Sequence, residues 1–367
     1  MLTGMGYRIQ VLENANLVGM VLAGDGMKMQ RALRIVMPLM LVLSLLLVCA
    51  PRFDRGETGL LASLTSGGDS SEAKPADAMA HIAFVKWFRG EDVSEYREAK
   101  LAWPFRPFTP AVASLLPLNP MTSLNVVNIA AMLITMLFLY LILQHLGFDY
   151  WWRILGCIMF IYSFPTFFYG TVGYVDPVMV CFATLGMYCI ATGRWIHLAA
   201  VIIIGTTVKE TIIILFPVIV AHFMLNKIPR IKQIVLMLVY IGGFVAAYYF
   251  VARFNPAQHD YTWQFSLRSL LFNLGRWKCY AGLILSFGIP GFLSLYALKY
   301  LKKSTEDETF IKYGTFLAGL ISVMVLYLYS VFSHYADGRT VWVTYPFTIP
   351  LAVLALERII EGRRNAR

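Results

Sequence analysis

The sequence predicts an all-α polytopic membrane protein. Of its 367 residues, 58% are hydrophobic and 14% are charged, whereas about 25% are charged in soluble domains. The apolar residues fall into runs long enough to cross a bilayer, and the alternating pattern of half-buried strands is nearly absent. This composition excludes both an ordinary soluble domain and a disordered chain.

About ten runs have the composition of membrane spans. The first, residues 33–50, follows Lys28, Arg31 and Arg34 and has no small-residue cleavage site, which indicates an uncleaved anchor. Residues 198–225 are interpreted as two short helices with Lys209-Glu210-Thr211 at the tip of their hairpin, rather than one interrupted helix. These two helices correspond to the runs 196–208 and 212–226. With the first span, the ten runs are completed by 122–146, 152–170, 177–193, 233–253, 279–299, 313–332 and 341–358.

The net charge of +10 is explained by the distribution of Lys and Arg along the chain. With both termini in the cytoplasm, the inner segments hold 17 of the 31 Lys and Arg residues, and eight of the other 14 lie in the long loop 51–106. This asymmetry follows the positive-inside rule, so no nucleic-acid partner is needed to explain the charge. It predicts an inner (plasma) membrane protein of bacterial type, with a cytoplasmic tail at 1–32, one transmembrane domain at 33–360 and a basic cytoplasmic tail at 361–367.

The first outer loop, residues 51–121, contains a predicted helix. Apolar residues follow Asp77 at helical spacing as far as Phe88, and Gly90 lies beyond the expected helix end. We expect this amphipathic helix to lie on the membrane surface. The following run, 103–117, is too short to cross a bilayer and is expected to re-enter it or to lie in its interface.

In this topology the unusual polar residues of the chain meet at the outer face. They include the first loop, the 254–278 loop, and the segments Tyr174–Pro177, Lys209–Thr211 and His334–Arg339. Ionisable residues at membrane depth are energetically costly and therefore indicate function. We expect a working site that faces outward.

An ordered set of patterns resembles the GT-C superfamily of integral-membrane glycosyltransferases. The set covers most of residues 33–360 and consists of Asp77-x3-His81-x2-Phe84 with Gly90, then Phe105-Arg106-Pro107, Lys209-Glu210-Thr211, and Gly338-Arg339 followed by Tyr345-Pro346. The resemblance implies a GT-C-like bundle and a polyprenyl-phosphate-linked sugar donor. It also implies an envelope glycan, lipid or protein as acceptor. Many members of the superfamily carry a pair of acidic residues in the first outer loop. In this chain Asp54 is the only acidic residue directly after the first span.

Inverting sugar transfer needs a carboxylate to accept the proton of the acceptor hydroxyl, and cations to stabilise the departing phosphate. Asp77 is the first choice for this base and Asp54 the second; the alternative for Asp77 is a helix N-cap on a solvated loop. The expected phosphate-binding residues are Arg339, Lys209 and Arg276, followed by Arg268 and Arg106.

Each of these cations also has a structural interpretation. Arg268 and Arg276 have the positions of side chains that snorkel to the membrane interface. Arg339 is near Asp337 in the sequence and can form an ion pair with it. Lys209 and Glu210 can neutralise one another at the hairpin tip.

The expected acceptor-binding or supporting residues are His81, Tyr174, Asp176, Glu210, His259 and Asp337. For Asp176 the favoured interpretation is a helix N-cap in front of Pro177, with acceptor contact as the alternative. The spacing of His259, Asp260 and His334 fits no specific metal site, so we expect no cofactor, with a divalent metal as the alternative.

Two other functions are compatible with the sequence. A transporter or flippase for a lipid-linked or anionic substrate also uses broken helices and outward cations. A non-catalytic GT-C homologue that binds lipid is favoured by the incomplete acidic pair.

Overall fold

The computed structural model describes residues 33–34, 36–53, 76–93, 106–253, 265–301, 308–333, 336 and 338–365. Within these ranges all regular secondary structure is helical. The chain divides into two units, Met1–Ser44 and Leu45–Arg367. The described residues of the first unit are helical. All the labelled helices belong to the second.

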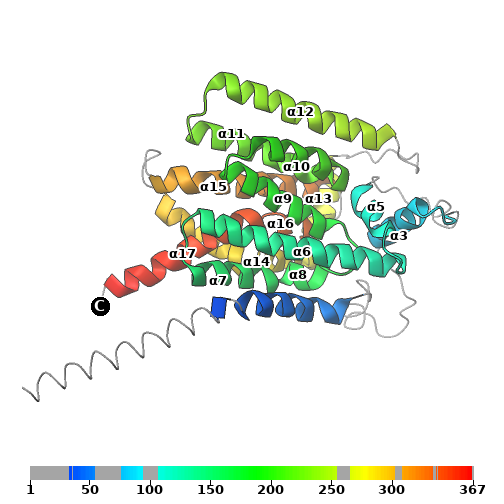
Figure 1. Cartoon of the computed structure of the whole chain (residues 1–367), viewed down its shortest axis with the longest axis horizontal. Coiled ribbons are helices and arrows are strands. Elements are labelled where there is room, and N and C mark those ends of the chain that lie inside the picture. Colours follow the sequence, from blue (N-terminus) through cyan, green and yellow to red (C-terminus); the bar gives the residue numbers. More distant parts are fainter. Residues whose placement is uncertain are drawn as a thin grey trace, which may run out of the picture. The chain divides into compact units, whose positions relative to one another are not determined.

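The second unit is a bundle of helices joined mostly by short turns (Figure 1). The first apolar helix, Val36–Arg52, ends inside it. The other helices are α3 (Ala76–Phe88), α5 (Phe108–Ser114), α6 (Pro120–His145), α7 (Tyr150–Ile161), α8 (Phe164–Tyr169), α9 (Asp176–Ala191), α10 (Trp195–Val208), η2 (Glu210–Ile214), α11 (Leu215–Leu225), α12 (Arg230–Arg253), α13 (Leu267–Leu274), α14 (Trp277–Leu301), α15 (Glu308–Ser333), α16 (Arg339–Trp342) and α17 (Tyr345–Asn365).

Four of these helices, α6, α12, α14 and α15, are long and apolar enough to cross a membrane. Six shorter apolar helices accompany them in the described ranges. Helix α12 packs mainly against α10 and exposes large apolar side chains along its length, including Leu238, Val245 and Tyr249. Soluble monomers rarely expose so continuous an apolar surface. The predicted all-helical, membrane type of fold is confirmed at this level.

The predicted break inside residues 198–225 is confirmed. Lys209 has an extended backbone (φ −165°, ψ 132°) between α10 and η2. The two arms run antiparallel, since the Trp195 ring lies 5.4 Å from the Phe223 ring near their far ends. Near the tip, a Cβ on Gly205 would come within 2.9 Å of Ile212. The turn therefore carries Lys209 and Glu210 to the end of the bundle where α9 also begins, which we name the Lys209 end.

Two spans that the sequence predicts as continuous are interrupted in the structure. The run 152–170 forms α7 and α8, because Ser163 accepts a hydrogen bond from Thr166 N (3.4 Å) and Pro165 occupies the first turn of α8. The run 279–299 lies in α14, where Gly288 adopts φ 54° and ψ −168°. Only glycine reaches this backbone conformation without strain.

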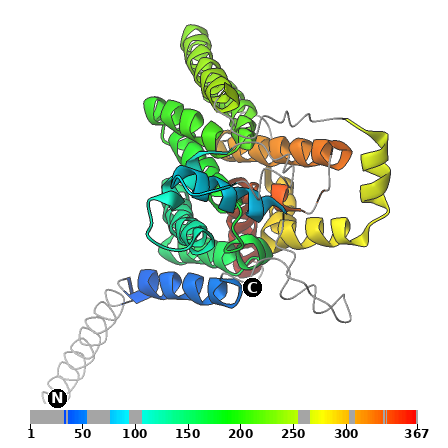
Figure 2. The same cartoon turned by 90° about the vertical axis from the view of Figure 1, so that its right-hand side faces the viewer.

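Helix α3 lies where the sequence predicts a helix after Asp77, and it packs against α5 and α6. Six consecutive residues, 80–85, are buried, so the middle of the helix is covered on all sides, whereas Trp87 and Phe88 at its end are exposed. Ile82 and Val85 pack with Ala113 of α5 and Leu124 of α6. Figure 2, in which the right-hand side of Figure 1 faces the viewer, shows α3 on the near side of the helices that it packs against.

Arg89 fastens α3 to the next two helices. Its guanidinium donates to the carbonyl oxygens of Ser114 (3.3 Å) and Leu116 (2.7 Å), and to Ser123 Oγ (3.0 Å). These acceptors lie at the end of α5, in the following turn and in the first turn of α6. Because a planar guanidinium can serve several acceptors at once, one side chain fixes three segments.

We predict that Arg89→Met lowers the free energy of unfolding by about 2 kcal/mol, since it leaves partly buried acceptors without a charged donor. Thermal unfolding of the purified protein in detergent measures this. The matched control is Arg268→Met on the surface of α13, where we expect a change below about 0.5 kcal/mol. Equal effects of the two substitutions would contradict the role given to Arg89.

Candidate functional site

Two ion pairs lie at the Lys209 end. Lys209 Nζ donates to Asp176 Oδ1 at 2.6 Å. Arg106 forms a two-pronged contact with Glu210, from Nη2 to Oε1 at 2.8 Å and from Nε to Oε2 at 3.3 Å. The exposed fraction of the four side chains is between 4% and 21%. Neighbouring residues of the hairpin tip thus bind to different partners, and the interpretation of Lys209 and Glu210 as a self-neutralising pair is wrong.

Asp176 is the most deeply buried member of these pairs, with 4% of its side chain exposed. The expectation that it caps α9 is wrong, because the helix begins at Asp176 itself and its N-cap position is Val175, which makes no side-chain cap. The carboxylate instead accepts the long-range bond from Lys209, 33 residues away. The sequence around Asp176 predicts a helix cap, but its side chain instead forms an ion pair with a residue distant in the sequence.

Arg339 is the third cation in this region. Its guanidinium carbon lies 4.2 Å above the centre of the Tyr174 ring. It is also close enough to Asp176 to stabilise the charged carboxylate. We use the name ion-pair cluster for Arg106, Tyr174, Asp176, Lys209, Glu210 and Arg339, all of which were among the residues predicted from the sequence.

Two turns hold the cluster in place. Gly173 (φ +80°) donates its N–H to Asn125 Oδ1 at 3.0 Å, and Asn128 Nδ2 donates to the Tyr174 carbonyl at 2.8 Å. Gly338 (φ +86°) lies against the Gly282 carbonyl of α14 so closely that any Cβ would collide with it. Both turns favour glycine for its backbone conformation, and Gly338 is also required for space. They position Tyr174 and Arg339 respectively.

The cations of the cluster favour the charged form of both carboxylates. Asp176 and Glu210 precede the predicted spans 177–193 and 212–226. Burial by itself raises the pKa of Asp176, but the Lys209 ammonium and the Arg339 guanidinium outweigh burial and hold that pKa below its ordinary value. Burial likewise raises the pKa of Glu210, and the Arg106 guanidinium lowers it below the usual range. Their charged state therefore depends on the cations: withdrawal of a cation would let the pKa of its carboxyl rise.

Four other predicted site residues are not fully described by the structure. Asp77 lies in the first turn of α3, but its side chain is outside the described part of the chain. Asp54, His259 and Asp337 lie outside the described residues altogether. The start of α3 is nevertheless next to the cluster, since a Cβ on Gly173 would lie 3.3 Å from Ala78 Cβ. His81, one turn further along α3, is buried.

Two predicted cations take no part in the ion pairs of the cluster. Arg268 is exposed on α13, and Arg276 is exposed with its guanidinium 3.7 Å from the centre of the Phe272 ring. These surroundings fit the alternative interpretation, in which both side chains snorkel toward an interface.

Three residues near the site were missed. Asn125 and Asn128 are polar residues three apart in the apolar run of α6, a spacing that was visible in the sequence and places both on one helix face. Arg52, at the end of the first apolar helix, is 3% exposed and lies 4.0 Å over the Phe168 ring. Its position directly after Pro51 gave no sign of this burial.

The ion-pair cluster offers cations and carboxylates but no metal site. Within the described part of the chain, no group of three or more His, Cys, Asp or Glu residues is arranged to hold a metal ion. Three cationic side chains in a partly buried site are suited to an anion, above all to a phosphate, which accepts several charge-assisted hydrogen bonds.

We predict that Asp176→Asn lowers the free energy of unfolding by about 3 kcal/mol, because it leaves the Lys209 charge buried without its counter-ion. Replacing both partners, as Asp176→Leu with Lys209→Met, is expected to recover much of the loss. The matched control is the exposed Arg358–Glu361 pair (3.1 Å), where Glu361→Gln is expected to cost less than about 0.5 kcal/mol. The free energy of unfolding is measured by chemical denaturation. If the effects of Asp176→Leu and Lys209→Met on it were simply additive in the double variant, the two side chains would not be directly paired.

Comparisons with known proteins add no relative. No protein-family model, no curated protein and no solved structure matches this chain. The functional assignment therefore rests on the ion-pair cluster and on the sequence around it.

Proposed function

We propose that this chain is a membrane glycosyltransferase of GT-C type. It transfers a sugar from a polyprenyl-phosphate-linked donor to an envelope glycan, lipid or protein acceptor. The observation that carries the proposal is the ion-pair cluster, in which four segments distant in the sequence bring three cations and two carboxylates to one end of the helices. The resemblance in the sequence supplies the substrate class.

The proposed topology has about ten spans. The four long helices and the shorter apolar helices supply the spans, with both termini in the cytoplasm according to the distribution of Lys and Arg. In this arrangement the Lys209 end faces the extracytoplasmic side of a bacterial-type inner membrane. A lipid-linked donor then approaches the cluster from the bilayer, with its phosphate at the level of the membrane surface.

Arg339, Lys209 and Arg106 hold the donor phosphate in this proposal. Lys209 and Arg106 neutralise Asp176 and Glu210 in the structure, so these cations are already partly desolvated and oriented. An incoming phosphate competes with the carboxylates for the same donors. Negative charge grows on the departing phosphate oxygen in the transition state, so preorganised cations accelerate this step.

Asp77 is the proposed general base. The acceptor hydroxyl oxygen attacks the anomeric carbon of the sugar, the bond from that carbon to the phosphate oxygen breaks, and the lipid phosphate leaves with the electron pair. The base takes the hydroxyl proton, and the configuration at the anomeric carbon is inverted. The start of α3 beside the Gly173 turn supports Asp77, and Asp54 is the alternative.

A transporter of lipid-linked or anionic substrates is the second candidate. The observation that favours it is the non-helical Gly288 inside the apolar helix α14. Interrupted helices commonly line the substrate path of transporters. Such a protein would move the lipid between leaflets without breaking the bond between sugar and phosphate.

We predict that a polyprenyl phosphate stabilises the full-length protein in nanodiscs against thermal unfolding, and that polyprenol of the same length does so much less. Arg339→Ala should weaken binding of the phosphate at least about tenfold, which corresponds to one lost charge-assisted contact. Arg339→Lys keeps the charge without the planar fork and should bind with intermediate affinity. Equal binding of polyprenol and polyprenyl phosphate would contradict the phosphate site.

Sugar transfer tests the base separately. Asp77→Asn should lower the transfer rate by about 100-fold or more, the usual contribution of general base catalysis, with little effect on phosphate binding. Arg363→Ala in the basic tail is the control and should leave both unchanged. If Asp77→Asn and Asp54→Asn both fold and transfer sugar at the normal rate, the assigned base is wrong. Movement of the intact lipid across vesicles without transfer would favour the transporter.

A further inference from the structure

The short helix α13 lies crosswise to two helices of membrane-spanning length. Figure 2 shows it at the edge of the bundle, between the ends of α14 (yellow) and α15 (orange). Ser266 N, directly before α13, donates to the Phe332 carbonyl of α15 at 2.9 Å, and α14 begins three residues after α13 ends. Because α14 and α15 are long and apolar enough to cross a membrane, α13 has the position of a helix that lies along the membrane surface.

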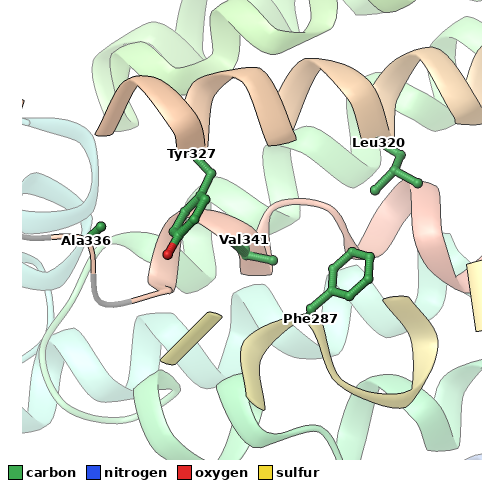
Figure 3. Close-up of a cluster of buried hydrophobic side chains, with 5 residues drawn as sticks. All are labelled: Phe287, Leu320, Tyr327, Ala336 and Val341. Atoms are coloured by element: carbon green, nitrogen blue, oxygen red, sulfur yellow. The ribbon is translucent and has the colours of Figure 1, made fainter. Parts of the chain in front are cut away.

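One side chain, Asn273, fixes the inner side of α13. It is 2% exposed, its Nδ2 donates to the Val331 carbonyl at 2.8 Å, and its Oδ1 accepts from Ala336 N at 3.2 Å. Ala336 belongs to a buried apolar cluster that includes Phe287 of α14 and Tyr327 of α15 (Figure 3). The orientation of α13 is therefore set by packed parts of the bundle.

The opposite side of α13 is apolar and exposed. Leu267, Leu271 and Leu274 have the i, i+4, i+7 spacing of one helix face, and they are between 50% and 66% exposed. At the start of α14, Trp277 and Tyr280 are exposed as well. Trp and Tyr are enriched where a membrane meets water, so this combination of side chains is suited to the boundary between headgroups and acyl chains.

The same stretch of chain is basic. Residues 265–280 contain three cations, Arg268, Arg276 and Lys278, and no acidic residue. All three cations are exposed. Arg268 and Phe272 are four residues apart and form the row of α13 next to the leucines, and the Arg276 guanidinium lies 3.7 Å from the centre of the Phe272 ring. A cationic row beside an apolar face is the pattern of a helix that binds an anionic membrane surface.

We propose that α13 is a binding surface for anionic phospholipids of the bilayer. Its leucines enter the upper acyl region, and Arg268 and Arg276 bind the headgroup phosphates. The charged side chains of residues 265–280 are all positive, so the ammonium group of a zwitterionic lipid finds no carboxylate in this stretch, and anionic lipids bind more tightly. The inference goes beyond the proposed function, because it requires only that the chain lies in a membrane.

Fluorescence quenching in lipid nanodiscs tests this surface directly. The full-length protein carries Leu271→Cys with an environment-sensitive fluorophore, and the unsubstituted protein, whose five cysteines are buried, gives the background. A nitroxide on the upper acyl chain is placed on phosphatidylglycerol or, at the same mole fraction, on phosphatidylcholine. We expect both lipids to quench the label, with phosphatidylglycerol enriched beside it at least about fivefold, the effect of one cation near an anionic membrane surface.

Matched variants locate the preference. Arg268→Gln with Arg276→Gln should abolish it, whereas Arg363→Gln with Arg364→Gln, which removes the same charge at the exposed end of α17, should leave it intact. A label at Ile321→Cys, exposed within the apolar length of α15, should show no preference. The proposal is overturned by a lack of quenching at the α13 label, by equal quenching from the two lipids, by the same preference at the α15 label, or by a preference that survives the loss of both α13 arginines.

Binding of polyprenyl phosphate separates this surface from the proposed donor site. The variant with Arg268→Gln and Arg276→Gln should bind polyprenyl phosphate as the unsubstituted protein does, because neither arginine belongs to the ion-pair cluster. Loss of that binding in this variant would assign the two arginines to the donor site and overturn the inference. Failure of the lipid preference alone leaves the proposed function untouched.

Discussion

The pairing of buried charges at the Lys209 end is the constraint on which the site depends. Moving one charged side chain out of water is costly, and the cost is offset only when a counter-ion and good geometry are present. Lys209 with Asp176, and Arg106 with Glu210, meet this condition at 2.6 and 2.8 Å. These pairs link the three segments that carry them, and the Arg106–Glu210 pair fixes the end of the first loop to the bundle.

The backbone around the pairs follows from this requirement. Lys209 is extended between α10 and η2, and at this turn two consecutive side chains, Lys209 and Glu210, pair with different partners. The turns at Gly173 and Gly338 bring Tyr174 and Arg339 to the same place. Helix α3, held by Arg89, covers the site from the first loop. Each of these features lies at one turn or one side chain. Together they produce a site in which cations are bounded by carboxylates.

Much of this arrangement was predictable from local patterns. A charged pair inside an apolar run predicted the break at Lys209, and apolar spacing after Asp77 predicted α3. The partners were not predictable, because Arg106 and Glu210 are 104 residues apart and nothing in either segment specifies the other. Asp176 illustrates the same limit: its sequence context favours a helix cap, yet a tertiary contact decides its role. In α14, Gly288 and Pro290 were the available signal for a break, and the apolar residues around them concealed it.

The most direct test of the central claim is a structure of the full-length protein in lipid nanodiscs with an added polyprenyl phosphate. If the cluster holds the donor phosphate, phosphate density is expected in contact with Arg339, Lys209 or Arg106, with the lipid chain leading into the bilayer and the Asp77 carboxylate within reach. Phosphate density bound elsewhere, with both ion pairs intact and a cavity open to the cytoplasm or to both sides, would show that the cluster is not the donor site.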